Sequence, residues 1–343
     1  MSDRPETPAD IQYPLPPEAI AQTPIEPRDS ARLLVDRGDS VEHRTVADLP
    51  ELLQPGDLLV VNDTRVLPAR IPVRRPTGGA AEILLLEERG DGWWEALARP
   101  SRKLTPGVTL TSGGLDLEMG DDLGDGRRLV RLDSGERPLL EVLGEVGLPP
   151  LPPYIEEQIA DPERYQTVFA DRPLSAAAPT AGLHLTDSVF ARLADRGVGV
   201  ATVELAVGLD TFRPVKVDRL DDHVIHTEWY RVPDAAAAAI DAADRVVAVG
   251  TTAVRAIETW AATGEREGRS SLFIRRPYDW QVVDLMMTNF HLPGSTLLCL
   301  VDAFVGPRWR DLYATALDEG YRFLSFGDCM ILGTENPRSR SGR

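Results

Sequence analysis

The sequence predicts an α/β protein whose main domain is built from both ends of the chain and is interrupted by a small β-barrel. Strands alternate with helices after residue 150, and one buried strand also stands before residue 70. Residues 70–147 instead hold short strand-like runs separated by glycine-rich turns. Alternating elements favour a mixed, largely parallel sheet, whereas frequent turns without a long helical period favour a barrel. We therefore expect an α/β domain from residues 1–69 and 148–335, a barrel at 70–147 and a disordered tail at 336–343.

The buried strand before residue 70 is the run Leu58–Val61. It follows a Pro-Gly-Asp turn, and four apolar residues in a row are typical of a strand covered on both faces. Asn62, Asp63, Thr64 and Arg65 come next, at the strand end where open α/β sheets bind ligands. A carboxylate there can orient hydroxyls or take a proton, and an arginine can clamp a carboxylate. The alternative is an Asx turn with a surface ion pair.

The remaining elements follow from apolar periodicity and from turn and cap residues. In the insert, strands are expected at 82–86, 93–97 and 128–132, and the proline-rich segment 148–154 predicts a stiff, extended connection. In the second half, helices are expected at 186–196, 234–243, 295–304 and 309–319 and after Gly250, and strands at 198–207 and 245–249.

The composition is that of a sizeable protein with a well-formed core. The 343 residues favour two domains, and 43% of them are hydrophobic. No apolar run reaches the roughly 18 residues of a membrane span, and the acidic, proline-rich start lacks the features of a signal peptide. Cys299 and Cys329 both stand in apolar surroundings, which predicts buried, inert thiols in a reducing compartment. We expect a cytoplasmic monomer without membrane contact.

The formal net charge of −17 argues against general binding of nucleic acid. A specific RNA contact would need a local basic face. One group of cations is close in sequence, and the alternative is that these side chains are scattered and solvated. The group consists of Arg70, Arg74, Arg75, Arg99, Arg102 and Lys103.

Two polar loops, 178–186 and 288–296, carry the strongest signal for a functional site. Each holds a histidine, His184 or His291, beside Thr, Pro and Gly, and each runs into an apolar-periodic stretch. This is how an α/β enzyme presents side chains at helix N-termini. The alternative is two ordinary helix caps with a buried histidine.

Three further segments are weaker candidates. Gly250-Thr251-Thr252 follows a buried strand and opens a helix, which suits a carboxylate or phosphate; one turn on, Arg255 and Glu258 are spaced to pair with each other. The segment 161–167 could stack on a base, or could be a solvated helix start. His223 and His226 have metal-like spacing but would face opposite sides of a strand, so no metal site is predicted.

Long, ordered motifs from Leu15 to Leu332 resemble the S-adenosylmethionine:tRNA ribosyltransferase-isomerase family of queuosine biosynthesis. The resemblance implies an α/β domain with an inserted β-barrel, and it implies the reaction. The ribosyl part of S-adenosylmethionine passes to 7-aminomethyl-7-deazaguanine at the wobble position of a GUN anticodon, and adenine and methionine leave. S-adenosylmethionine is then a co-substrate, with no cofactor. The matching segments are 20–29, 55–66, 151–155, 163–168, 178–184, 249–252, 288–293, 321–323 and 327–328.

The resemblance and the chemistry together suggest roles for the candidate residues. A base must remove the proton beside the sulfonium, and His184 is the first candidate. Asp63 would order the ribose or the amine, and Arg65 or Arg255 would hold the methionine carboxylate. Asn289 and His291 would hold adenine or the ribosyl unit. The predicted catalytic residues are His184, Asp63 and Arg65, and the predicted substrate-binding residues are Asn62, Thr64, Tyr154, Tyr165, Gln166, Thr180, Gly182, Thr251, Thr252, Arg255, Glu258, Asn289, His291 and Asp328.

The chain departs from the usual family pattern at four positions. Leu185 stands where the family usually has Phe, Ala206 for His, Asp210 for Gly and Gly294 for Lys. Losing a cation and gaining an anion favours a second hypothesis, the same sulfonium chemistry on a small amine or a free deazapurine. A third is a binding protein without catalysis, against which the retained polar residues argue.

Overall fold

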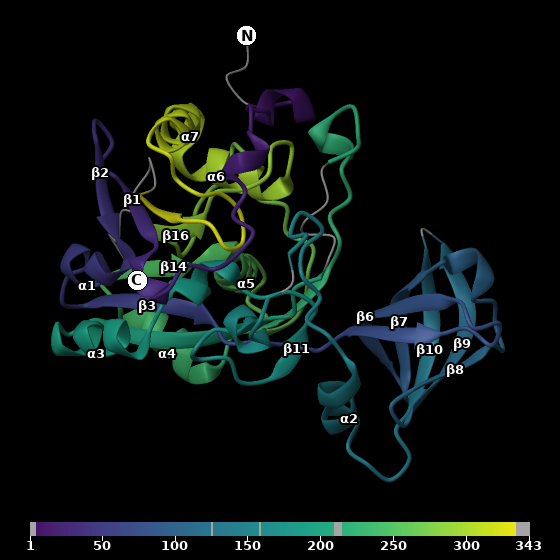
Figure 1. Cartoon of the computed structure of the whole chain (residues 1–343). Helices are drawn as coiled ribbons and strands as arrows, with labels where there is room; N and C mark the ends of the chain where they lie inside the picture. Colours follow the sequence, from purple (N-terminus) through teal and green to yellow (C-terminus); the bar gives the residue numbers. More distant parts are fainter. Residues whose placement is uncertain (1–4, 125, 158, 209–214, 334–343) are drawn as a thin grey trace. The chain divides into compact units, whose positions relative to one another are not determined.

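The computed structural model describes residues 5–124, 126–157, 159–208 and 215–333, which form two compact units. The first unit contains residues 1–64, 152–172 and 178–343, and the second contains 65–151 and 173–177. The chain thus leaves the first unit, builds the second and returns (Figure 1). The predicted disordered tail at 336–343 lies outside the described residues.

The first unit is built on a mixed sheet that has nine strands within the described residues. Its centre is parallel, because β12, β3, β14 and β16 pair in the same direction, while β13, β15 and β2 pair antiparallel at the two edges. β17 runs antiparallel to β16 and parallel to β1. In sheet order the strands are β15 (Glu267–Ser270), β13 (Glu228–Arg231), β12 (Gly199–Leu205), β3 (Asp57–Asn62), β14 (Arg245–Val249), β16 (Leu285–Asn289), β17 (Cys329–Gly333), β1 (Arg32–Asp36) and β2 (Val41–Thr45).

Apolar side chains on both faces explain why the central strands read as continuous hydrophobic runs. On one face, Leu59 and Val61 pack with Val189 and Leu193 of α3. On the other face, α5 lies across β12, β3, β14 and β16. The helices of this unit are α1 (Leu49–Leu52), α3 (Asp187–Asp195), α4 (Asp234–Ala242), α5 (Gly250–Thr263), α6 (Thr296–Val305) and α7 (Trp309–Asp318).

Two predicted helix starts have caps that can be seen in the structure. The Thr186 side chain accepts from the amide of Val189, and the Ser295 side chain accepts from the amide of Leu298. Each cap satisfies a backbone donor that a helix end leaves without an intrahelical partner. Caps therefore fix the starts of the helices that follow both histidine loops.

The second unit is a six-stranded antiparallel sheet, with α2 (Leu139–Val146) following its last strand. A hydrogen bond of 3.1 Å from Ser112 Oγ to the carbonyl of Pro72 joins its two edge strands, so the sheet curls into a barrel. In order the strands are β5 (Arg70–Arg74), β6 (Ala80–Gly90), β7 (Trp93–Arg99), β10 (Arg127–Asp133), β9 (Leu115–Gly124) and β8 (Thr109–Ser112). The prediction of an α/β protein with an inserted barrel is confirmed.

The compact unit around the barrel is longer than the expected insert of 70–147. It begins at Arg65 and includes 173–177, because β4 (Arg65–Val66) pairs in parallel with β11 (Pro173–Ser175). A pairing of two such short segments more than 100 residues apart leaves no local signal in the sequence. Residues 223–226 lie outside a strand, because β13 begins only at Glu228, so the strand geometry considered for His223 and His226 does not apply.

Candidate functional site

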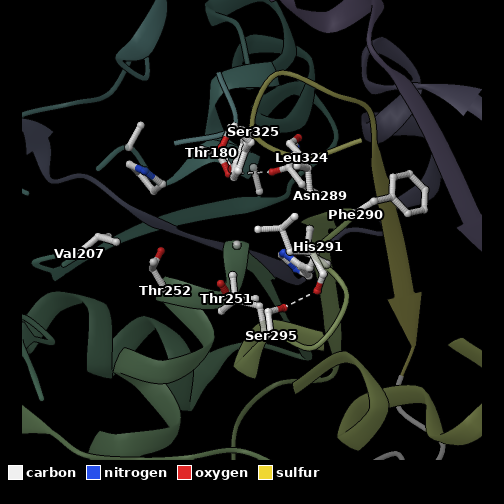
Figure 2. Close-up of a pocket in the computed structure, with 18 residues that line it drawn as sticks. Thr180, Val207, Thr251, Thr252, Asn289, Phe290, His291, Ser295, Leu324 and Ser325 are labelled. Carbon is white, nitrogen blue, oxygen red and sulfur yellow. Dashed lines mark hydrogen bonds between the residues drawn. The ribbon is translucent and has the colours of Figure 1, made fainter. Parts of the chain in front are cut away.

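An open pocket of about 600 Å³ lies in the first unit, beyond the carboxyl ends of the parallel strands. Val207 follows β12, Gly250 follows β14 and Phe290 follows β16, and all three line it. Figure 2 shows that the side chains come from several loops and point toward one space. Ligands of open α/β sheets bind at this edge.

The two histidine loops meet at this pocket. Residues 178–181 of the first loop and Thr288–Leu292 with Ser295 of the second belong to its lining. The rest comes from the start of α5, from Tyr154, Val207 and Leu297, and from Leu324 and Ser325. Loops more than 100 residues apart in sequence thus form one surface.

Asn289 joins the two loops through its side-chain amide. Its Nδ2 lies 3.3 Å from the carbonyl of Leu324 and 3.4 Å from that of Asp328, and carbonyls only accept hydrogen bonds. The orientation of the amide is therefore fixed, with Oδ1 toward Thr180, whose hydroxyl donates to it over 3.0 Å (Figure 2). Since that hydroxyl proton is used, the Thr180 oxygen keeps its lone pairs for a ligand.

The hydrogen bond from the Asn289 amide also determines which ring nitrogen of His184 carries the proton. Asn289 Nδ2 lies 3.1 Å from His184 Nε2, so this nitrogen accepts and the ring proton is on Nδ1. The ring is buried beside the guanidinium groups of Arg28, Arg164 and Arg322, and burial followed by these charges lowers its pKa to about 3. His184 does not belong to the pocket lining. It contacts the lining residue Asn289, and so lies one contact behind the surface that a ligand would touch.

His291 does line the pocket. Its Nε2 lies 2.9 Å from the Thr288 hydroxyl, and its backbone is held by two tyrosines: its amide donates to Tyr313 Oη and its carbonyl accepts from Tyr13. Burial lowers the pKa of His291 to about 3, so the ring is neutral at pH 7. A neutral imidazole is the form that can take a proton.

Tyr154 and Ser325 close another side of the pocket with a hydroxyl pair 2.6 Å apart. Burial raises the pKa of Tyr154, which keeps the phenol protonated. Leu324, beside Ser325, has φ of 69°, a left-handed backbone that is strained for a side chain of this kind. That strain presents the Leu324 carbonyl to Asn289.

At the start of α5 the pocket offers hydrogen-bonding groups without a side-chain cap. Val249 at the N-cap provides none, and Gly250 makes the turn into the helix with φ of 85°. Thr251 and Thr252 form the first turn, and the buried Thr252 Oγ has no hydrogen-bond partner among the described residues. A helix N-terminus favours negative charge or an acceptor, so this end of the pocket suits a carboxylate.

No Asp, Glu, Lys or Arg belongs to the part of the lining that the structure describes. The described lining is therefore an uncharged, largely apolar surface in which hydroxyls, an amide and an imidazole are set. Such a surface can hold a nucleoside by hydrogen bonds, and it places no cation against a positively charged sulfonium.

Asn62 and Thr64, which the sequence predicts to bind substrate, are buried and form hydrogen bonds with the protein backbone. The Asn62 amide donates to the carbonyl of Leu205 and accepts from its amide, at 3.0 and 3.1 Å. The Thr64 hydroxyl donates to the same carbonyl over 3.3 Å. Neither residue lines the pocket, and together they tie the end of β3 to β12.

Arg255, Glu258 and Asp328 are likewise absent from the lining and hold protein groups. Arg255 forms a buried ion pair with Glu228 rather than with Glu258. Glu258 accepts from three consecutive amides, 281–283, and from the Tyr278 hydroxyl. Asp328 accepts from the amides of Arg32 and Arg322. The carboxylates hold loops in place. The sequence alone does not distinguish this role from binding a ligand.

The other predicted residues are not among the pocket lining either. Tyr165 is fully buried against Phe326, which removes it from a role in stacking on an exposed base. The Gln166 backbone is held by Arg28, and Gly182 lies in a short 3-10 helix. Burial followed by the neighbouring Glu204 and Asp171 raises the pKa of Asp63, and Arg65 belongs to the second unit.

Comparison with known proteins identifies the family. The family model described as queuosine biosynthesis protein matches residues 9–332. The chain belongs to this family. An S-adenosylmethionine:tRNA ribosyltransferase-isomerase of Rubrobacter xylanophilus is 51% identical, over 94% of this chain and 96% of the relative. One of the same name from Thermus thermophilus is 49% identical, covering 93% and 97%. A crystal structure of S-adenosylmethionine tRNA ribosyltransferase from Thermotoga maritima has a TM-score of 0.54 and 34% identity, covering 94% and 99%.

The sequence did not predict some residues of the site, and one position of interest lies outside the described residues. Ser325 and Val207 line the pocket without having been predicted, although Ser325 stands just before the Gly327-Asp328 motif. Among the departures, Leu185 is buried in the core, Ala206 precedes the lining residue Val207, and Asp210 lies outside the described residues. No group of three possible metal ligands occurs in the described part of the chain, and no helix there is long and apolar enough to cross a membrane.

The fourth departure, Gly294, has a structural reason that can be measured. Its φ of 68° favours glycine, and an added Cβ would lie 2.5 Å from Nε2 of Gln12. We expect Gly294→Ala to lower the free energy of unfolding by about 1–3 kcal/mol in urea titrations. Gly320→Ala is the matched control, because φ is 69° there and nothing lies within 4 Å. Equal losses in the two variants would show that Gln12 moves aside freely.

Proposed function

We propose that this chain transfers the ribosyl moiety of S-adenosylmethionine to 7-aminomethyl-7-deazaguanine at the tRNA wobble position, giving epoxyqueuosine and releasing adenine and methionine. The observation that carries the proposal is that the segments resembling the family, 178–184, 249–252 and 288–293, meet in one pocket. Relatives that are about 50% identical to this chain over nearly their whole length bear the name of this activity.

The pocket suits the three parts of S-adenosylmethionine. The methionine carboxylate fits the start of α5, where Thr251 and Thr252 offer donors without a side-chain cap. The sulfonium fits the middle of the pocket, where the described lining carries no charged side chain. The nucleoside fits the hydroxyls of Thr180 and Ser325, which can hydrogen-bond to the ribose or to the edge of adenine. Arg255 is excluded as the carboxylate clamp, because Glu228 occupies it.

The reaction begins with loss of a proton from the carbon beside the sulfonium. His291 is the stronger candidate for this step, because it lines the pocket whereas His184 does not. His184 then acts through Asn289 as a positioning residue. The amine of the deazaguanine must be neutral to form its bond to the ribosyl unit. The bond from sulfur to the ribosyl carbon breaks with its electron pair on sulfur, so methionine leaves as a neutral thioether. Adenine leaves with the electron pair of its glycosidic bond, assisted by a hydrogen-bond donor.

The acceptor distinguishes this proposal from its main rival. The same chemistry on a small amine or a free deazapurine would need the same S-adenosylmethionine pocket, and the net charge of −17 favours an acceptor without phosphates. The relatives named for tRNA favour the RNA acceptor. We further propose that the enzyme is a cytoplasmic monomer and that S-adenosylmethionine is consumed as a co-substrate without a further cofactor.

The test is release of adenine and methionine from S-adenosylmethionine by the purified chain. The reaction is run with tRNA carrying the aminomethyl-deazaguanine, with the same tRNA carrying guanine, and with the free base. Release only with the first supports the proposal. Release driven by the free base points to the small-molecule enzyme. Absence of release under all three conditions, from folded protein, contradicts catalysis of this kind.

A further inference from the structure

The barrel of the second unit has two ends of opposite charge. β6 and β10 run away from one end and β7 and β9 run toward it, so the turns 75–79, 100–108 and 124–127 gather there. The segments 65–81 and 96–115 together contain seven Lys or Arg residues and no Asp or Glu. Much of this positive charge lies at that end, on a chain whose net charge is −17.

Four exposed cations define this surface, which we call the basic end: Arg74, Arg99, Arg102 and Lys103. Arg74 and Arg99 lie on the outer face of the barrel, because Val73 and Ala98 beside them are buried. Glu82 faces Arg99 in the register of β6 and β7, and about 10 Å, two strand spacings, separates Arg99 from β5, the strand that carries Arg74. Arg102 and Lys103 follow in the short helix after β7.

The cations of the basic end have no ion-pair partner among the described residues, while the acidic groups near them are mostly occupied. Glu82 pairs with Arg70 at 3.2 Å, and Asp122 pairs with the buried Arg128 at 2.9 Å. Asp121 is exposed near this end, and Asp125 lies outside the described residues. The surface therefore keeps a local excess of positive charge.

The other end of the barrel has the opposite arrangement. Exposed Glu88, Asp91, Asp133 and Glu136 lie at or beyond the ends of β6 and β10 there. The cations of that end are paired with carboxylates: Arg89 with Glu87 and Glu95, Arg131 with Glu118, and Arg137 with Glu141 and Glu145. A surface that binds a polyanion needs unpaired cations, because these can replace the counterions of phosphates. Such cations lie at the basic end, whereas those at the other end are neutralised by carboxylates.

We propose that the basic end of the barrel binds phosphate groups of the tRNA substrate. This inference rests on the proposed function, since it takes the partner to be tRNA. The contact is to the phosphate backbone, because Arg and Lys side chains on a convex barrel surface offer charge rather than a pocket for a base. It explains how an acidic protein holds a polyanion: attraction is confined to one face while the rest of the chain repels it.

The test compares two variants with the same change in charge. In the first, Arg74, Arg99, Arg102 and Lys103 are replaced by Gln. In the matched control, Arg37, Arg44, Arg192 and Arg266 of the first unit are replaced by Gln; their side chains are 43–46% exposed, and each variant loses four positive charges. Both variants should keep the wild-type thermal midpoint, because all eight side chains are at the surface. Binding of unmodified tRNA transcript is measured across a salt series.

We expect the first variant to bind at least about 10-fold more weakly near 0.1 M salt. The slope of log K against log salt should become shallower by about 3–4 if all four cations contact phosphates, since each lost contact removes about 0.7–0.9. The control should stay within about twofold of wild type. Equal binding by wild type and the first variant overturns the inference but leaves the proposed function intact. Equal weakening in both variants would show that binding depends on net charge and not on the basic end, which also overturns the inference. Failure of wild type to bind tRNA at any salt contradicts the proposed function itself.

Discussion

Replacing Asn289 with Ala is expected to lower kcat/KM for S-adenosylmethionine by at least about 100-fold, a loss of the size that follows from misplacing reacting groups by about 1 Å. The substitution removes a partner from the Thr180 hydroxyl, His184 Nε2 and the carbonyls of Leu324 and Asp328, of which the Leu324 carbonyl keeps the amide of Gly327. Each buried polar group left unsatisfied costs about 1–3 kcal/mol, so the variant should also unfold at lower denaturant concentration. Steady-state kinetics and urea titration measure both effects.

Variants of His184 separate positioning from simple packing. Gln at position 184 can still accept the hydrogen bond from Asn289, whereas Leu cannot. If His184 acts by holding Asn289, His184→Gln should retain much of the activity that His184→Leu loses, although both fold. A folded Asn289→Ala variant with near-wild-type kcat/KM would contradict the role of the amide. Equal and complete loss of activity in both His184 variants would instead indicate that His184 transfers a proton directly.

The second large effect is destabilisation in mild acid. Burial lowers the pKa of His184 and of His291 to about 3 in the folded chain, against the ordinary value of 6.5. The unfolded chain therefore takes up two protons below pH 6.5 that the folded chain refuses down to about pH 3. Stability is fully present above pH 6.5 and falls as the pH drops, by about 1.4 kcal/mol per pH unit for each ring. Between pH 6.5 and 5 the two rings together should remove roughly 4 kcal/mol.

The contribution of one ring is isolated by difference. Urea unfolding of wild type and of His184→Gln is measured at steps from pH 8 to pH 5, so that all other titrating groups cancel. Above pH 6.5 the two curves should run parallel. Below it, the wild-type free energy should fall more steeply by about 1.4 kcal/mol per pH unit. Parallel curves over the whole range would show that His184 charges as readily in the folded chain as in the unfolded one.

The fold could be predicted from the sequence because its signals are local. The apolar runs of β3 and β14, the caps Thr186 and Ser295, and the turn-rich insert each lie within a few consecutive residues. The same holds for the two histidine loops, whose residues do line one pocket. Strand ends of a parallel sheet meet at one edge, so loops that follow them converge.

The roles of single polar residues were harder to predict, because their partners come from distant segments. Asn62 bonds to Leu205, Arg255 to Glu228, and Tyr154 to Ser325, pairs separated by 143, 27 and 171 positions. A carboxylate such as Glu258 has the same appearance in sequence whether it holds a ligand or three backbone amides. Only the folded arrangement shows which polar groups are satisfied by the protein.

The measurement that tests the central claim most directly follows the ribosyl carbons. S-adenosylmethionine labelled with carbon-13 in all five ribosyl positions is incubated with the chain and tRNA carrying the aminomethyl-deazaguanine, and the digested tRNA is analysed by mass spectrometry. The proposed transfer predicts a wobble nucleoside heavier by all five labelled carbons, and unlabelled when the label is in the methyl group of S-adenosylmethionine. Label that stays in small molecules while adenine is released, or methyl label in the tRNA, would contradict it.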